Sequence, residues 1–311
     1  QQSVRVCDGQ RWVEITSGIG EVQTYNTGVE VVMHIGTDVD SAGRWWTDSQ
    51  ALEMQPRVRD SRPNYPYTLS EPIASNFFPC NAFSYINSTT AATKNMAVMA
   101  DRSRATASIR DGELQFLVQR RLIYDDNRGV GEPLDERTRV LTTSRVVFNT
   151  ADLFGDMRLG SLQQTHKPVL RYGAPSGATG AFPWLSRGPD AALPANVHLH
   201  TRTLLTPGTL LVRLQHLFAV GEGALAVPVT VSLAAALPSG AFITNVTDMD
   251  MNGVVEAARL SRADFATCVD GAVQHIPARP IGGASPVTGE VIHEVTLQPM
   301  EIRVLRIEYT V

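Results

Sequence analysis

Short runs of alternating apolar and polar residues recur along this chain of 311 residues, and turn-forming residues bound each run. Alternation with a period of two is typical of strands that bury one face. The runs are short, and proline and glycine are scattered throughout, which leaves little room for long helices. The pattern predicts strands at residues 29–35, 96–99, 114–122, 140–148, 210–214, 227–233 and 291–297.

Three segments depart from this alternation. Residues 151–164 and 261–273 have room for a helical turn or two, and neither shows a clean apolar stripe of 3.6-residue period. The last segment, 300–311, alternates with a phase slip at Val304 and Leu305, which predicts a β-bulge. The elements as a whole predict an all-β chain.

A stretch rich in Gly, Pro, Ala and Ser lies between Tyr172 and Ala195, and strand patterning resumes at Val197. Such a composition is typical of a connection between domains. The chain is long enough for two domains. We therefore predict one domain at residues 1–185 and a smaller one at residues 186–311.

The segment RDGELQFLVQRRLIYDDNRGVGEP, residues 110–133, places a charged loop directly after a strand. In the strand, Leu114, Phe116 and Val118 alternate with polar residues, and Leu117 is the one apolar residue out of phase. Most such loops are solvated turns, but a loop on a rigid sheet is also where binding residues are often found. The candidate residues of the segment are Arg120, Arg121, Asp125, Asp126, Arg128 and Gly129.

Composition and charge narrow the function classes. Hydrophobic residues make up 43% of the chain, enough for a sizeable core. The formal net charge is −4, and the absence of any basic block argues against nucleic acid and anionic membranes as partners. No apolar run approaches the ~20 residues of a membrane-spanning helix. The chain begins at Gln1 without a signal peptide, as a processed chain or an excised fragment would.

The three cysteines, Cys7, Cys80 and Cys268, lie far apart and lack the CxxC spacing of a zinc site. One disulfide with a leftover thiol and three buried free thiols both fit this spacing. Two sequons, at Asn87 and Asn245, are candidates for N-glycosylation and favour the secretory pathway.

Candidate metal ligands are few. His198 and His200 lie on one face of a predicted strand, a spacing that zinc can use. No third ligand follows at a comparable spacing, so an ordinary strand surface or a hydrogen-bonded pair is the better interpretation. His216 lies in an apolar strand and is predicted to make a structural hydrogen bond.

The run from Asp248 to Gly253 resembles the opening of a calcium loop. An EF-hand requires a bidentate glutamate at its twelfth position, where this chain has Arg259. The surrounding pattern is that of strand and turn rather than of two helices. The run is therefore interpreted as an acidic turn.

Motifs for nucleophilic or nucleotide chemistry are missing from the sequence. There is no GxSxG elbow and no Walker loop, and the cysteines lack a catalytic context. Glycoside hydrolysis normally uses two carboxylates that flank one bond. Asp125 and Asp126 are adjacent and would point to opposite sides of an extended segment. They are predicted instead to accept hydrogen bonds from nearby backbone N–H groups, or to pair with Arg120 or Arg121.

Three blocks of sequence carry a resemblance to a known family. They are DRSRATASIRDGELQFLVQRRLIYDDNRGVGEPLDE, EPIASNFFPCNAFSYI and LVRLQHLFAVGE. They are similar to the C-terminal half of lysosomal-type α-mannosidases, glycoside hydrolase family 38. Matching blocks run from about Val4 to the final LQPMEIRVL, so the resemblance spans nearly the whole chain.

The resemblance implies a fold and an activity. The fold would be a large galactose-mutarotase-like β-sandwich, present only in part, followed by a smaller terminal β-sandwich. The family's enzymes are retaining glycosidases that hydrolyse α-mannosides of N-glycans in the lysosome or another acidic compartment. They use an aspartate nucleophile and a zinc ion, both held by an N-terminal α/β domain that this chain does not resemble. We therefore predict no catalytic residue and no metal ligand in this chain, and the catalytic domain as its partner.

The resemblance also implies site residues. In the family, the loop that matches Asp125 to Gly131 reaches toward the sugar pocket, and an arginine there lies close to substrate. By motif position this arginine is Arg128, and Gly129 would let the backbone approach the sugar. The loop would be supported by Asp125, Asp126, Arg120 and Arg121. In the alternative interpretation, Arg128 only anchors the loop to its own sheet.

Two other functions fit the sequence. A carbohydrate-binding module would display an exposed aromatic platform, for which Trp45-Trp46, Phe77-Phe78 and Trp184 are the candidates, although paired aromatics in strands are more often core. A purely structural domain would only dock onto the catalytic domain.

Overall fold

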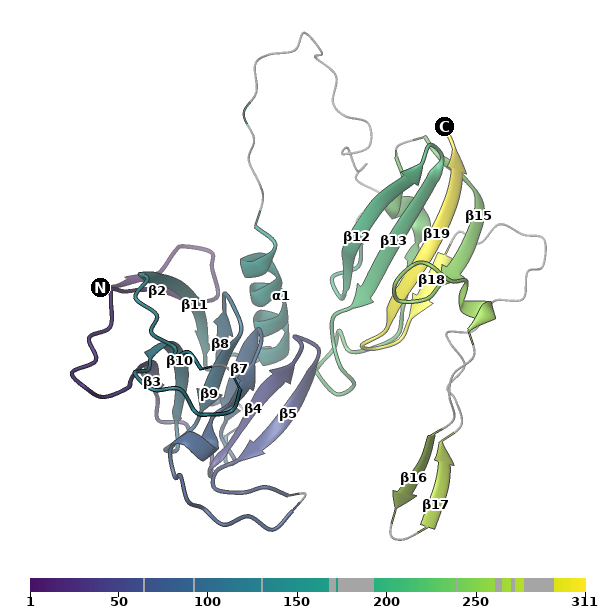
Figure 1. Cartoon of the computed structure of the whole chain (residues 1–311). Helices are drawn as coiled ribbons and strands as arrows, with labels where there is room; N and C mark the ends of the chain where they lie inside the picture. Colours follow the sequence, from purple (N-terminus) through teal and green to yellow (C-terminus); the bar gives the residue numbers. More distant parts are fainter. Residues whose placement is uncertain are drawn as a thin grey trace. The chain divides into compact units, whose positions relative to one another are not determined.

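A computed structural model describes residues 1–63, 65–91, 93–129, 131–167, 172, 193–238, 240–260 and 294–311, and the backbone alone of 265–269 and 272–276. The chain divides into two units, Gln1–Leu170 and Arg171–Val311 (Figure 1). The predicted division between residues 185 and 186 lies outside the described residues. Among the described residues, no helix is long and apolar enough to cross a membrane.

The first unit contains a seven-stranded sheet of order β1-β2-β11-β8-β7-β4-β5, in which every pair of neighbours is antiparallel. Alternating apolar residues from distant parts of the sequence bring these strands together. The strands are β1 (Gln2–Arg5), β2 (Val13–Ile19), β4 (Arg44–Ser49), β5 (Glu53–Val58), β7 (Phe83–Asn87), β8 (Asn95–Ala100) and β11 (Val140–Phe148).

A second sheet, of order β3-β10-β9-β6, packs on one face of the first. Its strands are β3 (Val29–Gly36), β6 (Phe78–Cys80), β9 (Arg104–Ala107) and β10 (Glu113–Arg121), and the 3-10 helix η1 (Ala74–Asn76) precedes β6. The core between the sheets includes Trp45, which is fully buried, together with Phe116 and Met96.

Helix α1 (Leu153–Thr165) covers the other face of the seven-stranded sheet, where Leu153 and Met157 pack against residues of β7 and β8 (Figure 1). The prediction of only a helical turn or two was wrong. The buried side of α1 carries polar residues, and this hides the apolar stripe. The side chains of Asp156 and Arg158 are both buried. Asp156 forms an ion pair with Arg11, and Arg158 donates to the Leu52 carbonyl.

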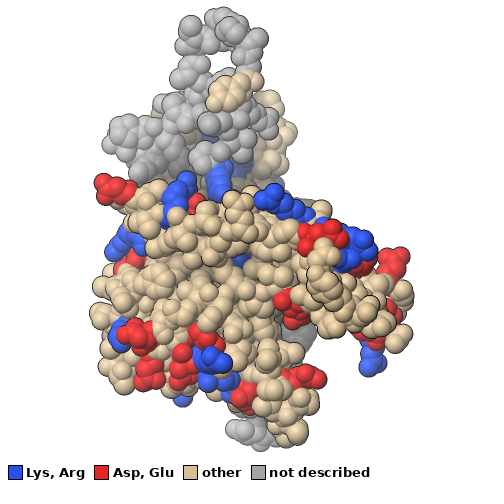
Figure 2. All heavy atoms as spheres, turned by 90° about the vertical axis from the view of Figure 1, so that its left-hand side faces the viewer, with Lys and Arg blue, Asp and Glu red and all other residues tan. Residues whose placement is uncertain are grey.

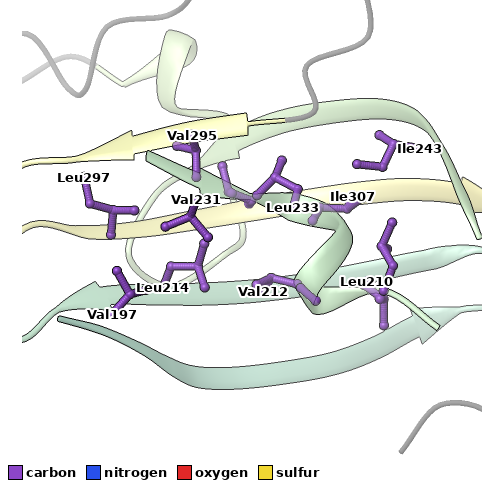
Figure 3. Packing of buried hydrophobic residues seen from close by; sticks show 13 residues of the cluster. Val197, Leu210, Val212, Leu214, Val231, Leu233, Ile243, Val295, Leu297 and Ile307 are labelled. Atoms are coloured by element: carbon purple, nitrogen blue, oxygen red, sulfur yellow. The ribbon is translucent and has the colours of Figure 1, made fainter. Parts of the chain in front are cut away.

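The second unit has a four-stranded sheet of order β12-β13-β19-β15 and a two-stranded sheet of β14 and β18. The strands are β12 (Val197–Thr206), β13 (Thr209–His216), β14 (Val229–Ser232), β15 (Phe242–Met249), β18 (Glu294–Leu297) and β19 (Ile302–Thr310), with 3-10 helices η3 (Leu233–Ala236) and η4 (Ala257–Arg259). The inner faces of both sheets meet in one apolar core, in which Val212, Leu214 and Ile307 face Val231 and Leu297 (Figure 3). The all-β prediction is confirmed.

Two details of the second unit correct the sequence predictions. Residues 261–273 were expected to have room for a helical turn or two, but the described backbone there contains strand β16 (Phe265–Val269) and the start of β17 (Ala272–Ile276), which pair antiparallel. The bulge predicted at Val304 and Leu305 is absent from the described ladders of β19, where both residues pair in register with β13. Both are buried because Leu305 joins the inner core and Val304 packs on the outer face of the sheet.

A bulge does occur in β10, where the register with β3 shifts between Leu117 and Gln119. This explains why Leu117 is out of phase in the sequence. Before the shift, the buried side chains of β10 include Leu114 and Phe116. After it, the buried side chains are those of Gln119 and Arg121. The bulge thus turns a polar and a charged side chain inward just before the loop.

Candidate functional site

The loop between β10 and β11, residues 122–139, is closed at its base by hydrogen bonds between its two stems. The Leu122 N–H donates to the Leu134 carbonyl at 2.8 Å. Gln119 lies near the C-terminal end of β10, and its Nε2 donates to the Thr138 carbonyl at 2.9 Å. These contacts hold the stems together, and residues 123–129 and 131–133 belong to the tip of the loop between them.

Arg121 ties this loop to a second one. Its Nε donates to Asp135 Oδ1 at 2.6 Å, and its Nη1 donates to the Val22 carbonyl at 2.6 Å. Nη1 also lies 3.4 Å from Glu21 Oε1. Only 7% of the Arg121 side chain is exposed, so the planar guanidinium is held in one geometry. We call this set of contacts the Arg121 clamp.

Arg120 points the other way, as alternation along a strand requires. Its side chain is 42% exposed and pairs with Glu30 on β3 at 3.2 Å. The prediction that Arg120 or Arg121 pairs with Asp125 or Asp126 was wrong among the described contacts. The bulge in β10 decides that Arg121 rather than Arg120 faces inward. The partner of Arg120 lies on β3, and the partners of Arg121 lie in the loops that precede β3 and follow β10.

Asp125 and Asp126 shape the tip of the loop. Asp125 Oδ2 accepts from the Asn127 N–H at 2.9 Å, and Asp126 Oδ1 accepts from the Arg128 N–H at 3.0 Å. Asn127 has a φ of 58°, a left-handed conformation that asparagine tolerates. The predicted hydrogen bonds to nearby backbone N–H groups are confirmed.

Arg128 lies at the end of this turn with an exposed side chain. Its guanidinium has no ion pair or hydrogen bond to any residue that the structure describes. Gly129 follows with a φ of 132°, and apart from Gly129 and its chain neighbours no described heavy atom lies within 4 Å of the position that a Cβ would take. The described contacts therefore give no anchor for Arg128 on its own sheet.

The Arg121 clamp has a defined pH dependence. Side-chain hydrogen bonds, from Arg121 first and then Arg137, hold the pKa of Asp135 below its ordinary value of 3.8. A carboxyl whose pKa is lowered by folding contributes stability that is fully present above its unfolded pKa and is lost as pH falls through the folded pKa.

We therefore expect the loop stems to stay closed at mildly acidic pH and to loosen only below the ordinary aspartate range. The amide NMR shift of Leu122, which donates across the stems, measures this directly. The Asp135→Asn variant should lose the acid transition. A transition of Leu122 near neutral pH would contradict the expectation.

The structure brings together no three potential metal ligands among the residues it describes. The ring centroids of His198 and His200 lie 5.9 Å apart on β12. The register of β12 against β13 shifts between Leu199 and Thr201, at the position of His200. The pair lacks the third ligand that a zinc site requires.

His216 is fully buried, and its prediction as a structural hydrogen-bonding residue is confirmed. The Phe218 N–H donates to His216 Nδ1 at 3.2 Å, and Nε2 lies 2.9 Å from the Val227 carbonyl oxygen. In the acidic run of residues 248–253, Asp248 and Met249 end strand β15, and residues 250–253 form the predicted turn. Asp250 Oδ1 accepts from two backbone N–H groups, and Asp248 forms a bidentate pair with Arg303.

Cys7 is half-buried and Cys80 is buried, and both are free thiols. The alternative of three buried thiols is therefore wrong for Cys7, and the side chain of Cys268 lies outside the described residues. Asn245 is exposed on β15, whereas Asn87 is half-buried at the end of β7. N-glycosylation of these two residues stays a prediction.

The described candidates for an aromatic platform, Trp45, Trp46, Phe77 and Phe78, are buried or half-buried. Trp45 is fully buried with Phe78 against its edge, and Trp46 stacks on Tyr85. Phe77 is half-buried, and Trp184 lies outside the described residues.

Figure 2 shows one face of the molecule, on which basic and acidic side chains are intermingled around a broad area without charged side chains.

Sequence reasoning missed Asp135 and Val22, the partners of Arg121. Val22 acts through its carbonyl, about which the side-chain pattern says nothing. Asp135 is one acidic residue among several in the loop, and only the folded stems bring it to Arg121.

Residues 1–128 match the model of the glycosyl hydrolases family 38 C-terminal domain. The lysosomal α-mannosidase of Homo sapiens is 35% identical over 97% of this chain and 30% of its own length. The lysosomal α-mannosidase of Dictyostelium discoideum is 29% identical over 87% of this chain and 28% of its own length. The chain thus spans about a third or less of these relatives.

The crystal structure of an α-mannosidase from Enterococcus faecalis aligns with this chain with a TM-score of 0.55 and 12% sequence identity. The aligned region covers 99% of this chain and 28% of the α-mannosidase. At this identity the likeness shows the fold alone. The sequence matches carry the assignment: the chain belongs to glycosyl hydrolase family 38, and its residues 1–128 match the C-terminal domain of that family.

Proposed function

We propose that this chain is the C-terminal β region of a retaining, zinc-dependent α-mannosidase that hydrolyses α-mannosides of N-glycans. The nucleophile and the zinc ligands would lie in a catalytic domain of the same protein. The lysosome, or another acidic compartment, is its proposed location, because several relatives carry the name of lysosomal enzymes. The chain would scaffold that domain and lend one loop to its sugar pocket.

The chemistry of the described residues supports a catalytic centre outside this chain. Hydrolysis of a glycosidic bond needs two carboxyl groups on opposite sides of that bond. Asp125 and Asp126, the acidic pair of the loop, each accept a hydrogen bond from the turn they build. The histidine pair on β12 does not fit zinc, so no step is assigned to a metal held here.

The observation that carries the proposal is the contrast within the loop. Its base is held by a buried arginine, while its tip presents an exposed arginine that lacks a partner among the described residues. A side chain held ready in this way can donate several hydrogen bonds to sugar hydroxyls or hold a carboxylate of the pocket.

The first test compares this chain with the longer protein, which is the protein that contains both this chain and the proposed catalytic domain. Hydrolysis of a chromogenic α-mannoside is measured for each at acidic pH with added zinc. We expect the chain alone to be inactive and the longer protein to be active. Activity of the chain alone would contradict the proposed location of the catalytic centre.

The second test replaces Arg128 with alanine in the longer protein. Loss of charged hydrogen bonds to the substrate should lower kcat/KM about tenfold without a change in thermal stability. Arg110→Ala is the matched control, because Arg110 is an exposed arginine just before the opposite end of β10. Equal activity of the two variants would assign Arg128 to the scaffold.

A further inference from the structure

Arginine and aromatic side chains close one edge of the first unit, where β5 and β6 meet. β5 is the last strand of the seven-stranded sheet, and β6 is the last strand of the four-stranded sheet. The guanidinium carbon of Arg57, on β5, lies 4.4 Å from the centre of the Phe78 ring on β6. The guanidinium carbon of Arg62, on the connection between these strands, lies 4.5 Å from the centre of the same ring. We call these three residues the arginine stack.

The core and the backbone hold the arginine stack in place. Arg57 is the cross-strand partner of the fully buried Trp45, so both side chains lie on the inner face of the sheet. Arg57 Nε donates to Thr47 Oγ1 at 3.0 Å, and Arg62 donates to two backbone carbonyls. Arg57 therefore keeps both of its NH₂ groups without a hydrogen-bond partner among the described residues.

No described carboxylate neutralises the arginine stack. Burial first, and then the charge of Arg62, lower the pKa of Arg57 below its ordinary value, so the two cations repel each other. Asp60 is the acidic residue nearest to them in the sequence, and it forms no ion pair with either arginine in the described part of the chain. By contrast, Arg59, which lies between them in the sequence, forms an ion pair with Asp111.

Tyr67 adds an unsatisfied polar atom to the same place. The centre of its ring lies 5.0 Å from the guanidinium carbon of Arg62, and its hydroxyl is buried without a hydrogen-bond partner among the described residues. Such an atom indicates a partner that the described residues do not supply. The same connection also exposes three large side chains, those of Tyr65, Leu69 and Ile73. Arginine and tyrosine are enriched at protein–protein interfaces, where they act as anchors.

We propose that the arginine stack is the docking site for an acidic side chain of the catalytic domain of the same protein. A carboxylate there would offset the repulsion between the guanidiniums and accept the hydrogen bonds that Arg57 can still donate. Aspartate and glutamate are the protein side chains with this charge. The chain spans 30% of the length of the relative from Homo sapiens, so a protein of that length has ample further chain to supply one. This docking site rests on the proposed function and names the contact through which the chain scaffolds its partner.

Carbodiimide cross-linking of the longer protein tests the docking site, because this reagent joins an amine to a carboxylate in contact with it. Arg57→Lys and Arg62→Lys each introduce an amine at the stack and keep the positive charge. Mass spectrometry should find each introduced lysine joined to an aspartate or glutamate of the catalytic domain. Lys94 and Asp38, an exposed ion pair at 2.5 Å, provide the internal positive control. The yield should exceed that of the exposed control Arg110→Lys about tenfold, because docking raises the effective concentration of the carboxylate.

Cross-links that reach only carboxylates of this chain or of a second copy would overturn the docking site. So would the absence of a cross-link at the stack in a sample where Lys94 is joined to Asp38, or a yield no higher than that of Arg110→Lys. Hydrolysis of the chromogenic α-mannoside is measured on the unaltered longer protein in parallel. If that protein is inactive but the variants form the expected cross-links, the proposed function fails, whereas the docking site stands as a contact with the remaining part of the protein.

Discussion

Replacing Asp48 with alanine is expected to lower the free energy of unfolding by about 3–5 kcal/mol. Asp48, near the end of β4, is 2% exposed and accepts four backbone hydrogen bonds. Its Oδ1 accepts from the N–H groups of residues 81, 82 and 83 at 2.8, 3.0 and 3.2 Å. Its Oδ2 accepts from the Ala51 N–H at 2.6 Å.

The size of this effect follows from what alanine would leave behind. Each buried N–H without an acceptor costs about 1–3 kcal/mol, and rearrangement or water recovers part of the total. The carboxylate also organises a strained turn, since Gln50 and Ala51 have φ values of 55° and 60°. Non-glycine residues adopt this conformation only when their surroundings impose it.

Urea denaturation of the chain measures the loss. Asp48→Asn should be intermediate, because it keeps one oxygen acceptor and turns an NH₂ group toward a backbone donor. Asp38→Ala is the control, since Asp38 is an exposed partner of Lys94, and little change is expected. Equal midpoints for Asp48→Ala and Asp38→Ala would show that the turn holds without the carboxylate.

Asp48 also shows where sequence reasoning ends. Several strands, among them β3, β10, β11 and β13, follow from alternation, which is a local property of the chain and can be read directly. The acceptor role of Asp48 depends on a turn more than 30 residues away, which only the pairing of β4 with β7 brings near. Helix α1 was underestimated for a related reason, because its buried polar residues find partners in loops that are distant in the sequence.

The candidate site divides in the same way. The turn at Asp125 and Asp126 is local, and the sequence predicts it correctly. The difference between Arg120 and Arg121 is not local in this sense. Which of them is buried is set by the bulge between Leu117 and Gln119, and the sign of the bulge in the sequence is one apolar residue out of phase.

Replacing Arg121 with methionine is expected to lower kcat/KM of the longer protein about a hundredfold and the free energy of unfolding by about 2–4 kcal/mol. Methionine fills much of the buried volume but cannot donate to Asp135 or to the Val22 carbonyl. The two loops would then part, and a displacement of about 1 Å at the tip is enough for an effect of this size.

Arg121 acts here as a positioning residue, and the expected kinetics differ from those of a residue with only a structural role. Arg121→Lys keeps the charge but cannot make both donor contacts in one plane, so it should recover stability more fully than activity. Asp135→Asn should weaken the same contact from the other side. The double variant Arg121→Met/Asp135→Asn should lose less than the sum of the single losses, because the pair forms one interaction.

Arg120→Met provides the matched control one residue away. Its partner Glu30 is 47% exposed, and breaking an exposed ion pair costs little. Steady-state kinetics and urea denaturation of both variants would decide the matter. If Arg120→Met and Arg121→Met lost activity equally, the position of the tip would not depend on the Arg121 clamp. A large loss for Arg121→Met alone would show that a bulge in one strand, by deciding which arginine faces inward, sets the geometry of the loop that carries Arg128.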